Sequence, residues 1–112
     1  MADYKKLTGD ISSTLMEYSK KSPDLMKSFH TLSGAATKTG ALDEKTKELI
    51  ALATGVATRC PGCIGFHTKK LVKLGVTEQE LIEMLDVAVY MGGGPSLMYA
   101  AEVLDAYKQF AQ

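Results

Sequence analysis

Apolar residues recur every three or four positions along most of the chain, which is the period of an α-helix. Near the N-terminus two such stripes are separated by Ser22-Pro23, an N-cap residue followed by a proline suited to the first helical turn. Gly40 is expected to end the second helix. The first stripe consists of Tyr4, Leu7, Ile11, Leu15 and Tyr18, and the second of Leu25, Phe29, Leu32 and Ala36.

The middle of the chain predicts two further helices separated by a short break. Asp43 is expected to cap a third helix that is apolar over much of its surface and therefore close to the core. Pro61 and Gly62 interrupt this pattern, and a fourth helix is expected from about Cys63 to Gly75. The apolar positions of the third helix are Leu49, Ile50, Leu52, Ala53 and Val56.

The C-terminal third predicts a last pair of helices. Thr77 and Glu80 have the spacing of a capping box, Gly92 to Gly94 should stop the helix that follows, and Pro95 should open the next one. No segment alternates with the period of two that a strand requires. The sequence therefore predicts an all-α fold, a bundle of about six helices, in one domain spanning residues 1–112.

Charge and hydropathy narrow the range of partners. The 13 Lys and Arg residues balance the 13 Asp and Glu residues, so the formal net charge is zero. This balance argues against a nucleic-acid partner and against a polybasic membrane anchor. The apolar stretches are too short to span a bilayer, and the N-terminal residues lack the apolar core of a secretory signal. We therefore expect no membrane partner and a cytoplasmic location.

The candidate chemistry is concentrated in one segment. The chain has two cysteines, Cys60 and Cys63, which are separated by Pro-Gly, and His67 follows four residues later. In a reducing compartment a Cys-x-x-Cys pair is more often redox-active or metal-binding than a structural crosslink. Positions 63 and 67 share one helical face, and an imidazole beside a thiol favours the nucleophilic thiolate. A helix N-terminus adds a favourable partial positive charge.

Glu48 precedes Cys60 by twelve residues and could supply a carboxylate to this group. It reaches the group only if its helix folds back onto the helix of His67, and spacing does not establish that contact. The thiols alone also leave open which sulfur attacks. The more N-terminal thiol is the nucleophile in many Cys-x-x-Cys proteins, whereas the spacing to His67 favours Cys63.

Four runs give this chain a specific resemblance, over about residues 42–107, to the carboxymuconolactone decarboxylase/alkylhydroperoxidase D-like family. They are Lys47-Glu48-Leu49-Ile50-Ala51-Leu52-Ala53, Cys60-Pro61-Gly62-Cys63-Ile64-Gly65-Phe66-His67, Gly75-Val76-Thr77-Glu78-Gln79-Glu80-Leu81 and Gly92-Gly93-Gly94-Pro95. The resemblance implies an all-helical fold that assembles into homotrimers or homohexamers. It also implies a thiol peroxidase or disulfide oxidoreductase that needs no bound cofactor or metal.

Carried over by position, the resemblance gives each candidate residue a catalytic role. Cys63 becomes the sulfenic acid, and Cys60 is its partner, which donates a proton and then closes the disulfide. Glu48 and His67 form the proton relay. The implied partners are a hydroperoxide substrate and a dithiol reductant, such as a lipoyl domain or a thioredoxin-like protein.

Two departures from the family pattern affect the functional assignment. Gly62 stands where peroxidase members often have a histidine, and decarboxylase members generally lack the cysteine pair that is present here. Besides the peroxidase, two alternatives therefore stay open. One is a zinc-binding module that uses Cys60, Cys63, His67 and Glu48. The other is a lactone-processing decarboxylase.

Overall fold

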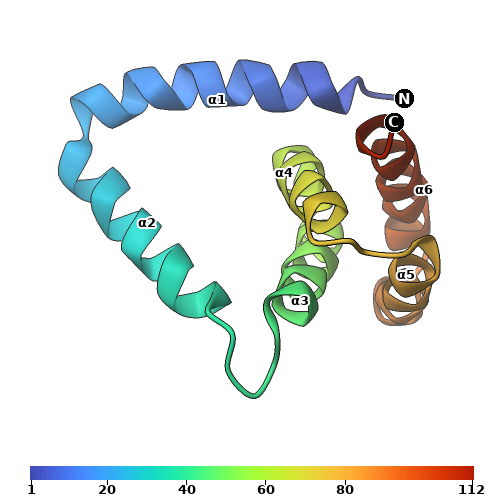
Figure 1. Cartoon of the computed structure of the whole chain (residues 1–112). Helices are drawn as coiled ribbons and strands as arrows, with labels where there is room; N and C mark the ends of the chain where they lie inside the picture. The colour runs from blue at the N-terminus through green and yellow to red at the C-terminus, as the bar shows by residue number, and fades with distance from the viewer.

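The computed structural model describes all 112 residues and contains six α-helices and no strand, which confirms the predicted all-α class (Figure 1). None of the helices is long and apolar enough to cross a membrane. The helices are α1 (Tyr4–Lys21), α2 (Pro23–Thr37), α3 (Glu44–Ala57), α4 (Pro61–Lys73), α5 (Glu78–Gly92) and α6 (Gly94–Phe110).

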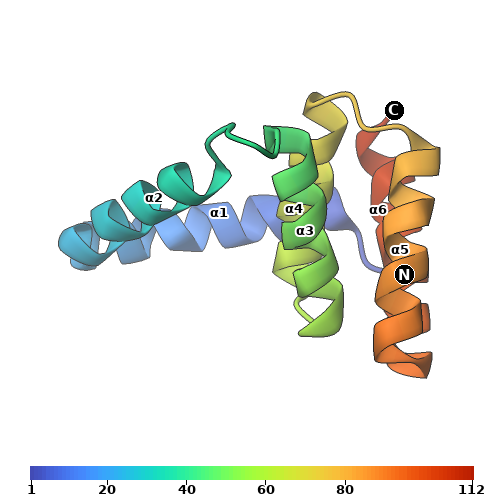
Figure 2. The same cartoon turned by 90° about the horizontal axis from the view of Figure 1, so that it is seen from below.

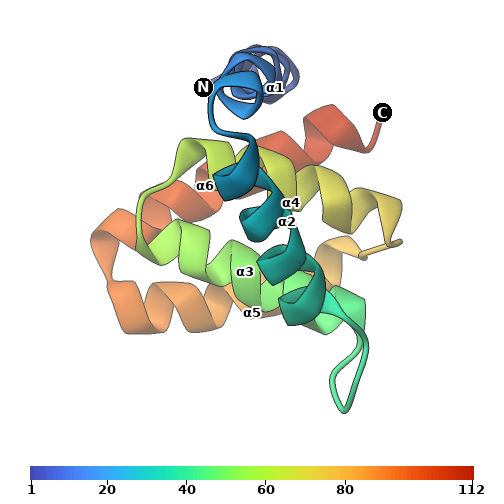
Figure 3. The same ribbon diagram turned by 90° about the vertical axis from the view of Figure 1, so that its left-hand side faces the viewer.

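The α3–α4 hairpin lies between two other units (Figures 1 and 2). The α5–α6 hairpin packs on one side of it, with α6 against α4 and α5 against α3. On the other side, α1 crosses α4 and α6, while α2 contacts only α1 and α3. Seen from the side of α2, α1 is viewed nearly end-on above the two hairpins, and α2 runs down their near face (Figure 3).

Two local capping signals in the sequence predict the start of a helix correctly. The Asp43 side chain accepts the Thr46 backbone N–H at 2.7 Å and begins α3, as predicted. At α5, the Thr77 hydroxyl accepts the Glu80 N–H at 3.0 Å, and the Glu80 carboxylate accepts the Thr77 N–H at 2.9 Å. Both bonds of the predicted capping box are therefore present.

Two predicted boundaries and one predicted capping bond differ from the structure. The prediction that Gly40 ends α2 is wrong, because Thr37 is the last helical residue. Lys38 then continues with extended backbone at φ −61° and ψ 134°, so no left-handed glycine is needed. Ser22 occupies the N-cap position of α2, but its side chain makes no capping hydrogen bond.

The third difference concerns α4, which begins at Pro61, about two residues before the predicted start. Proline suits the first helical position because its missing N–H would have no partner there.

At the turn between α5 and α6, of the three glycines only Gly93 adopts a positive φ, of 71°. Gly92 and Gly94 lie within the helices on either side of it.

The core is formed where α4 meets α1, α3 and α6, and where α5 packs on α3 and α6. Gly65 allows α1 to approach α4 closely, because a Cβ atom at this position would lie 2.6 Å from Thr8 Cγ2. The core residues are Tyr4, Leu52, Val56, Ile64, Leu71, Val76, Leu81, Leu85, Ala100, Val103 and Ala106.

Helix α2 contributes nothing to this core. None of its residues is buried, and Leu25, Phe29 and Leu32 are 54%, 60% and 63% exposed. Their spacing places them on one face of the helix. A helix of this length gains most of its stability from packing an apolar face, and within one chain this face has no cover.

Tyr4 links the start of α1 to α6 through hydrogen bonds. Its phenol is buried and donates a hydrogen bond to Glu102 Oε1 at 2.7 Å, and its backbone N–H donates to Gln109 Oε1 at 2.7 Å. Burial, followed by the adjacent Glu102 carboxylate, raises the pKa of the Tyr4 phenol above its ordinary value near 10. The neutral phenol is therefore part of the folded structure.

We predict that Tyr4→Phe destabilises the protein by about 1 kcal/mol at neutral pH through loss of the phenol hydrogen bond. Since the phenol has a higher pKa folded than unfolded, its contribution is complete below pH 10 and is lost as the pH rises further. The difference between wild type and variant should shrink by about 1 kcal/mol between pH 10 and pH 11. Urea unfolding of both proteins at both pH values measures this difference in the free energy of unfolding. A difference that stays constant between the two pH values would contradict the prediction.

Candidate functional site

The two cysteines lie at the junction of α3 and α4 and are joined as a disulfide, with their Cα atoms 5.2 Å apart. Cys60 is the N-cap residue of α4, and its Sγ accepts the Cys63 backbone N–H at 3.1 Å. Both residues are half-buried. The disulfide that the family resemblance implies between Cys63 and Cys60 agrees with this geometry.

Glu48 and His67 meet across the interface between α3 and α4. The His67 Nδ1 atom lies 2.7 Å from Glu48 Oε2, which confirms the contact that the sequence spacing could not establish. Glu48 is 5% exposed, whereas about a third of the His67 side chain is accessible to solvent. The pair therefore connects a buried carboxylate to an imidazole at the surface.

The hydrogen bond determines how this pair can move a proton. An ionised Glu48 carboxylate can only accept, so the proton on His67 then resides on Nδ1. The Nε2 atom makes no hydrogen bond within the chain and is available to accept a proton, which it can then donate. His67 lies one turn after Cys63 on the same face of α4, so carboxylate, imidazole and sulfur follow one another along one helix interface.

A pocket of about 280 Å³ lies between α1, α6 and the start of α4, where Pro61 lines it but neither cysteine does. Glu102 and the buried phenol of Tyr4 contribute polar atoms to it, and Tyr99 contributes an aromatic ring. The lining residues are Ala2, Tyr4, Pro61, Met98, Tyr99 and Glu102. Sequence reasoning missed Tyr4 and Glu102, because they reach this place only through the packing of α1 on α6.

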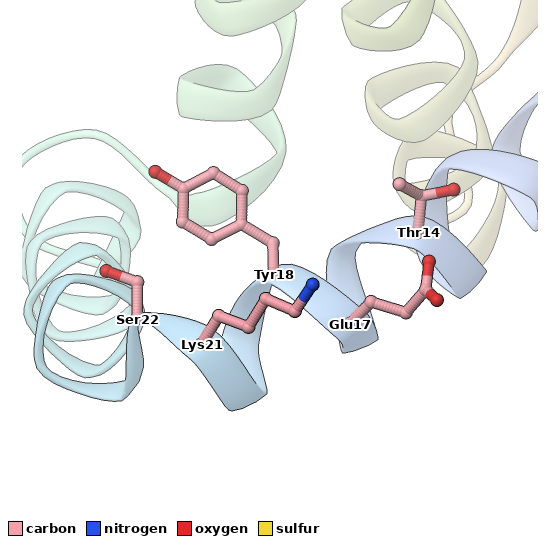
Figure 4. Close-up of a pocket in the computed structure, with 5 residues that line it drawn as sticks. All are labelled: Thr14, Glu17, Tyr18, Lys21 and Ser22. Atoms are coloured by element: carbon pink, nitrogen blue, oxygen red, sulfur yellow. The ribbon is translucent and has the colours of Figure 1, made fainter.

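A larger surface pocket, of about 470 Å³, lies at the elbow between α1 and α2 (Figure 4). It contains a tyrosine, a carboxylate and an ammonium group but no thiol or imidazole. Its lining residues are Thr14, Glu17, Tyr18, Lys21 and Ser22. Because size alone does not make a reactive site, we place the chemistry at the disulfide and the Glu48–His67 pair, whose residues line neither pocket.

The zinc alternative finds no support in this arrangement. No group of three or more His, Cys, Asp and Glu side chains is placed so that it could hold a metal ion. The sulfurs of Cys60 and Cys63 are bonded to each other and offer no thiolate ligands in this state.

The fold and the site together define a helical protein with a Cys-x-x-Cys disulfide next to an acid–imidazole pair. The model of the carboxymuconolactone decarboxylase family matches residues 23–106 of the chain. The chain belongs to this family. The resemblance predicted from the four sequence runs is confirmed.

Similar proteins come from several bacteria. An apo carboxymuconolactone decarboxylase family protein of Legionella pneumophila has a crystal structure with 58% identity and a TM-score of 0.96, covering 97% of each chain. A Thermotoga maritima family protein, described as having a possible part in an antioxidative response, has 28% identity and a TM-score of 0.80, covering 91% of this chain and 87% of its own. An uncharacterized Cupriavidus necator protein is 35% identical over 105 residues, 88% of this chain and 93% of its own.

We predict that the two partners of the Glu48–His67 pair contribute unequally to stability. His67→Ala leaves a buried carboxylate without its partner and should cost about 2 kcal/mol, whereas Glu48→Gln removes the charge and should cost about 1 kcal/mol. Urea unfolding of both variants and of the double variant measures the coupling. Additive effects, or a greater cost for Glu48→Gln, would show that the pair does not interact in solution.

Proposed function

We propose that the protein is a thiol-dependent peroxidase or disulfide oxidoreductase that reduces hydroperoxides through a dithiol–disulfide cycle of Cys60 and Cys63. The observation that supports this most directly is the disulfide at the start of α4, with the Glu48–His67 pair one turn further along that helix. A nucleophile, a second thiol and a proton relay lie on one interface, and these are the parts that such a cycle requires.

In the first step, the Cys63 thiolate attacks the terminal oxygen of a hydroperoxide. An S–O bond forms and the O–O bond breaks, so sulfur is oxidised to the sulfenic acid and the peroxide is reduced to an alkoxide. The alkoxide takes up the proton that His67 accepted when the Cys63 thiol ionised, and it leaves as an alcohol. Glu48, hydrogen-bonded to Nδ1, holds the imidazole in place.

The second step produces the disulfide that the structure contains. Cys60 attacks the sulfur of the sulfenic acid, the S–O bond breaks, and the departing hydroxide takes up the proton that the Cys60 thiol gives up and leaves as water. A dithiol reductant then regenerates both thiols by exchange and is itself oxidised to a disulfide. A lipoyl domain or a thioredoxin-like protein would be suitable, and a cytoplasmic location would keep such a reductant available.

The choice of Cys63 as the attacking sulfur rests on two features of its surroundings. It shares a helical face with His67, and it lies on the inner side of the hairpin against α3. Cys60 occupies the N-cap, where the Cys63 N–H favours a thiolate. This suits Cys60 as the sulfur that attacks the sulfenic acid and later exchanges with the reductant.

The family description raises a second candidate, a lactone-processing decarboxylase. Decarboxylation of a lactone changes no oxidation state in the enzyme, so a disulfide has no part in it. The cysteine pair therefore favours the peroxidase. A decarboxylase activity that survived replacement of both cysteines would favour the alternative.

We predict that Cys63→Ser abolishes hydroperoxide consumption in the presence of a dithiol reductant, because serine cannot form the sulfenic acid. Cys60→Ser should stop after one equivalent and accumulate a sulfenic acid on Cys63, which mass spectrometry detects as an added oxygen. Glu48→Gln should keep the disulfide but lower the rate by about 100-fold.

Thiol titration before and after one equivalent of peroxide gives the matching measurement on the wild type. Both thiols should disappear together. Full peroxidase activity in Cys63→Ser, or an added oxygen on Cys60 in Cys63→Ser at the wild-type rate, would refute the assignment of Cys63.

We also propose that the exposed face of α2 is covered by other copies of the chain. The residues Leu25, Phe29 and Leu32 form an apolar row on a helix without any buried residue, which a stable helix normally packs against a partner. The family resemblance points to a homotrimer or homohexamer. Closed symmetry of this kind would cover the row in every copy.

We predict that Phe29→Asp dissociates the assembly, because it places a charge in the middle of the apolar row. Light scattering should show an oligomer for the wild type at micromolar concentration and smaller species for the variant. Thr31→Asp, at an exposed position of the same helix that does not share the face of the row, is the matched control and should leave the mass unchanged. A monomeric wild type would refute the proposal.

A further inference from the structure

The turn between α3 and α4 links Cys60 to Gly55. The Cys60 backbone N–H donates to the Gly55 carbonyl oxygen at 3.0 Å, and the Arg59 N–H donates to the Val56 carbonyl at 3.3 Å. The Arg59 backbone is left-handed, with a positive φ of 58°. These are the two hydrogen bonds and the left-handed residue of a Schellman motif, which closes the C-terminal end of a helix. Cys60 is thus the final residue of this motif and also the N-cap of α4.

Gly55 also lies against the second cysteine. It is buried, and a Cβ atom at this position would lie 3.0 Å from Cys63 Cβ and 3.9 Å from the Ile64 nitrogen. A distance of 3.0 Å between two carbon atoms is well inside their optimal separation. The first turn of α4 can therefore approach α3 this closely because position 55 has no side chain.

The same helix interface holds the proton relay. Glu48 lies two turns before Gly55 on α3, and His67 lies one turn after Cys63 on α4. The hairpin thus has two facing pairs, Gly55 with Cys63 and Glu48 with His67. A change in helix spacing at the first pair would reach the second.

We infer that Gly55 is a positioning residue that fixes both cysteines and thereby sets how readily they form the disulfide. Its carbonyl holds Cys60 through a hydrogen bond, and its missing side chain makes room for Cys63. The cysteine pair that Gly55 positions is the pair on which the proposed function rests, but the effect of Gly55 on the disulfide requires no hydroperoxide.

The direction of the effect follows from the two connections to the first turn of α4. Rotating the Cys63 side chain does not move its Cβ, so a methyl group at position 55 must displace the backbone of that turn. In the disulfide form, the turn is tied to Cys60, which is itself tied to Gly55 by a hydrogen bond. In the dithiol form the sulfur bond is absent, and the turn can yield more easily. A side chain at position 55 therefore disfavours the disulfide more than the dithiol.

The test is the equilibrium of Cys60 and Cys63 with a glutathione redox buffer, measured by counting thiols with mass spectrometry. Gly55→Ala should shift this equilibrium toward the dithiol by about tenfold, which corresponds to a potential higher by about 30 mV. Gly34→Ala is the matched control, since Gly34 also lies inside a helix and a Cβ there meets nothing within 4 Å. Both variants gain the helix propensity of alanine, and the control should leave the equilibrium unchanged.

A second pair of variants keeps the inference testable if Gly55→Ala folds poorly. Cys63→Gly removes the atom that the new methyl group would strike, so Gly55→Ala should destabilise the wild type but not the Cys63→Gly background. An unchanged equilibrium in a folded Gly55→Ala variant, or the same loss of stability in both backgrounds, would overturn the inference. If the wild type consumed no hydroperoxide while the equilibrium shifted as expected, the proposed function would fail and the role of Gly55 would stand.

Discussion

The close approach of α3 and α4 is the constraint on which the rest of the molecule depends. Leu52 and Val56 on α3 and Ile64 and Leu71 on α4 are buried in the shared core, and they hold the two helices in one register. That register places Glu48 opposite His67, and the cysteine pair lies at the end of the hairpin where α3 joins α4. Burial of apolar surface thus supplies the free energy, and the polar and sulfur chemistry lies on the same interface.

The surrounding helices hold this hairpin and complete its environment. Helix α6 packs along α4 and provides Glu102, which binds the phenol of Tyr4 from α1. Helix α1 in turn lies on Gly65, one turn after the start of α4. The pocket at Pro61 is consequently built from both ends of the sequence. Its shape depends on the docking of the N-terminal residues and not only on the segment that contains the cysteines.

Much of the fold could be predicted from the sequence because its signals are local. Hydrophobic periodicity gave six helices, and Asp43 and Thr77 marked two of their starts through hydrogen bonds within one turn. The end of α2 was misplaced because a glycine suggested a left-handed cap, whereas the chain leaves the helix in an extended conformation at Lys38. Local residue types do not distinguish these two ways of ending a helix.

The site shows the same division between local and long-range information. The cysteine pair and the position of His67 could be identified by spacing alone, and Glu48 could be proposed but not placed. Gly55 and Glu102 could not be found, because a glycine in a helix and a glutamate on a helix face have no chemical signature in a sequence. Their importance depends on which atoms lie opposite them, and only packing decides that.

The double role of Cys60 limits how the chain can vary in length. The residue ends one helix and begins the next, so no spacer separates α3 from α4. Insertion or deletion of a single amino acid between positions 57 and 61 would break one of these two connections and rotate one thiol away from the other. In the loop from Lys38 to Asp43, no residue both ends one helix and begins the next, and all the residues are exposed. Natural or engineered insertions should therefore accumulate in that loop, while the connection at Cys60 keeps a fixed length.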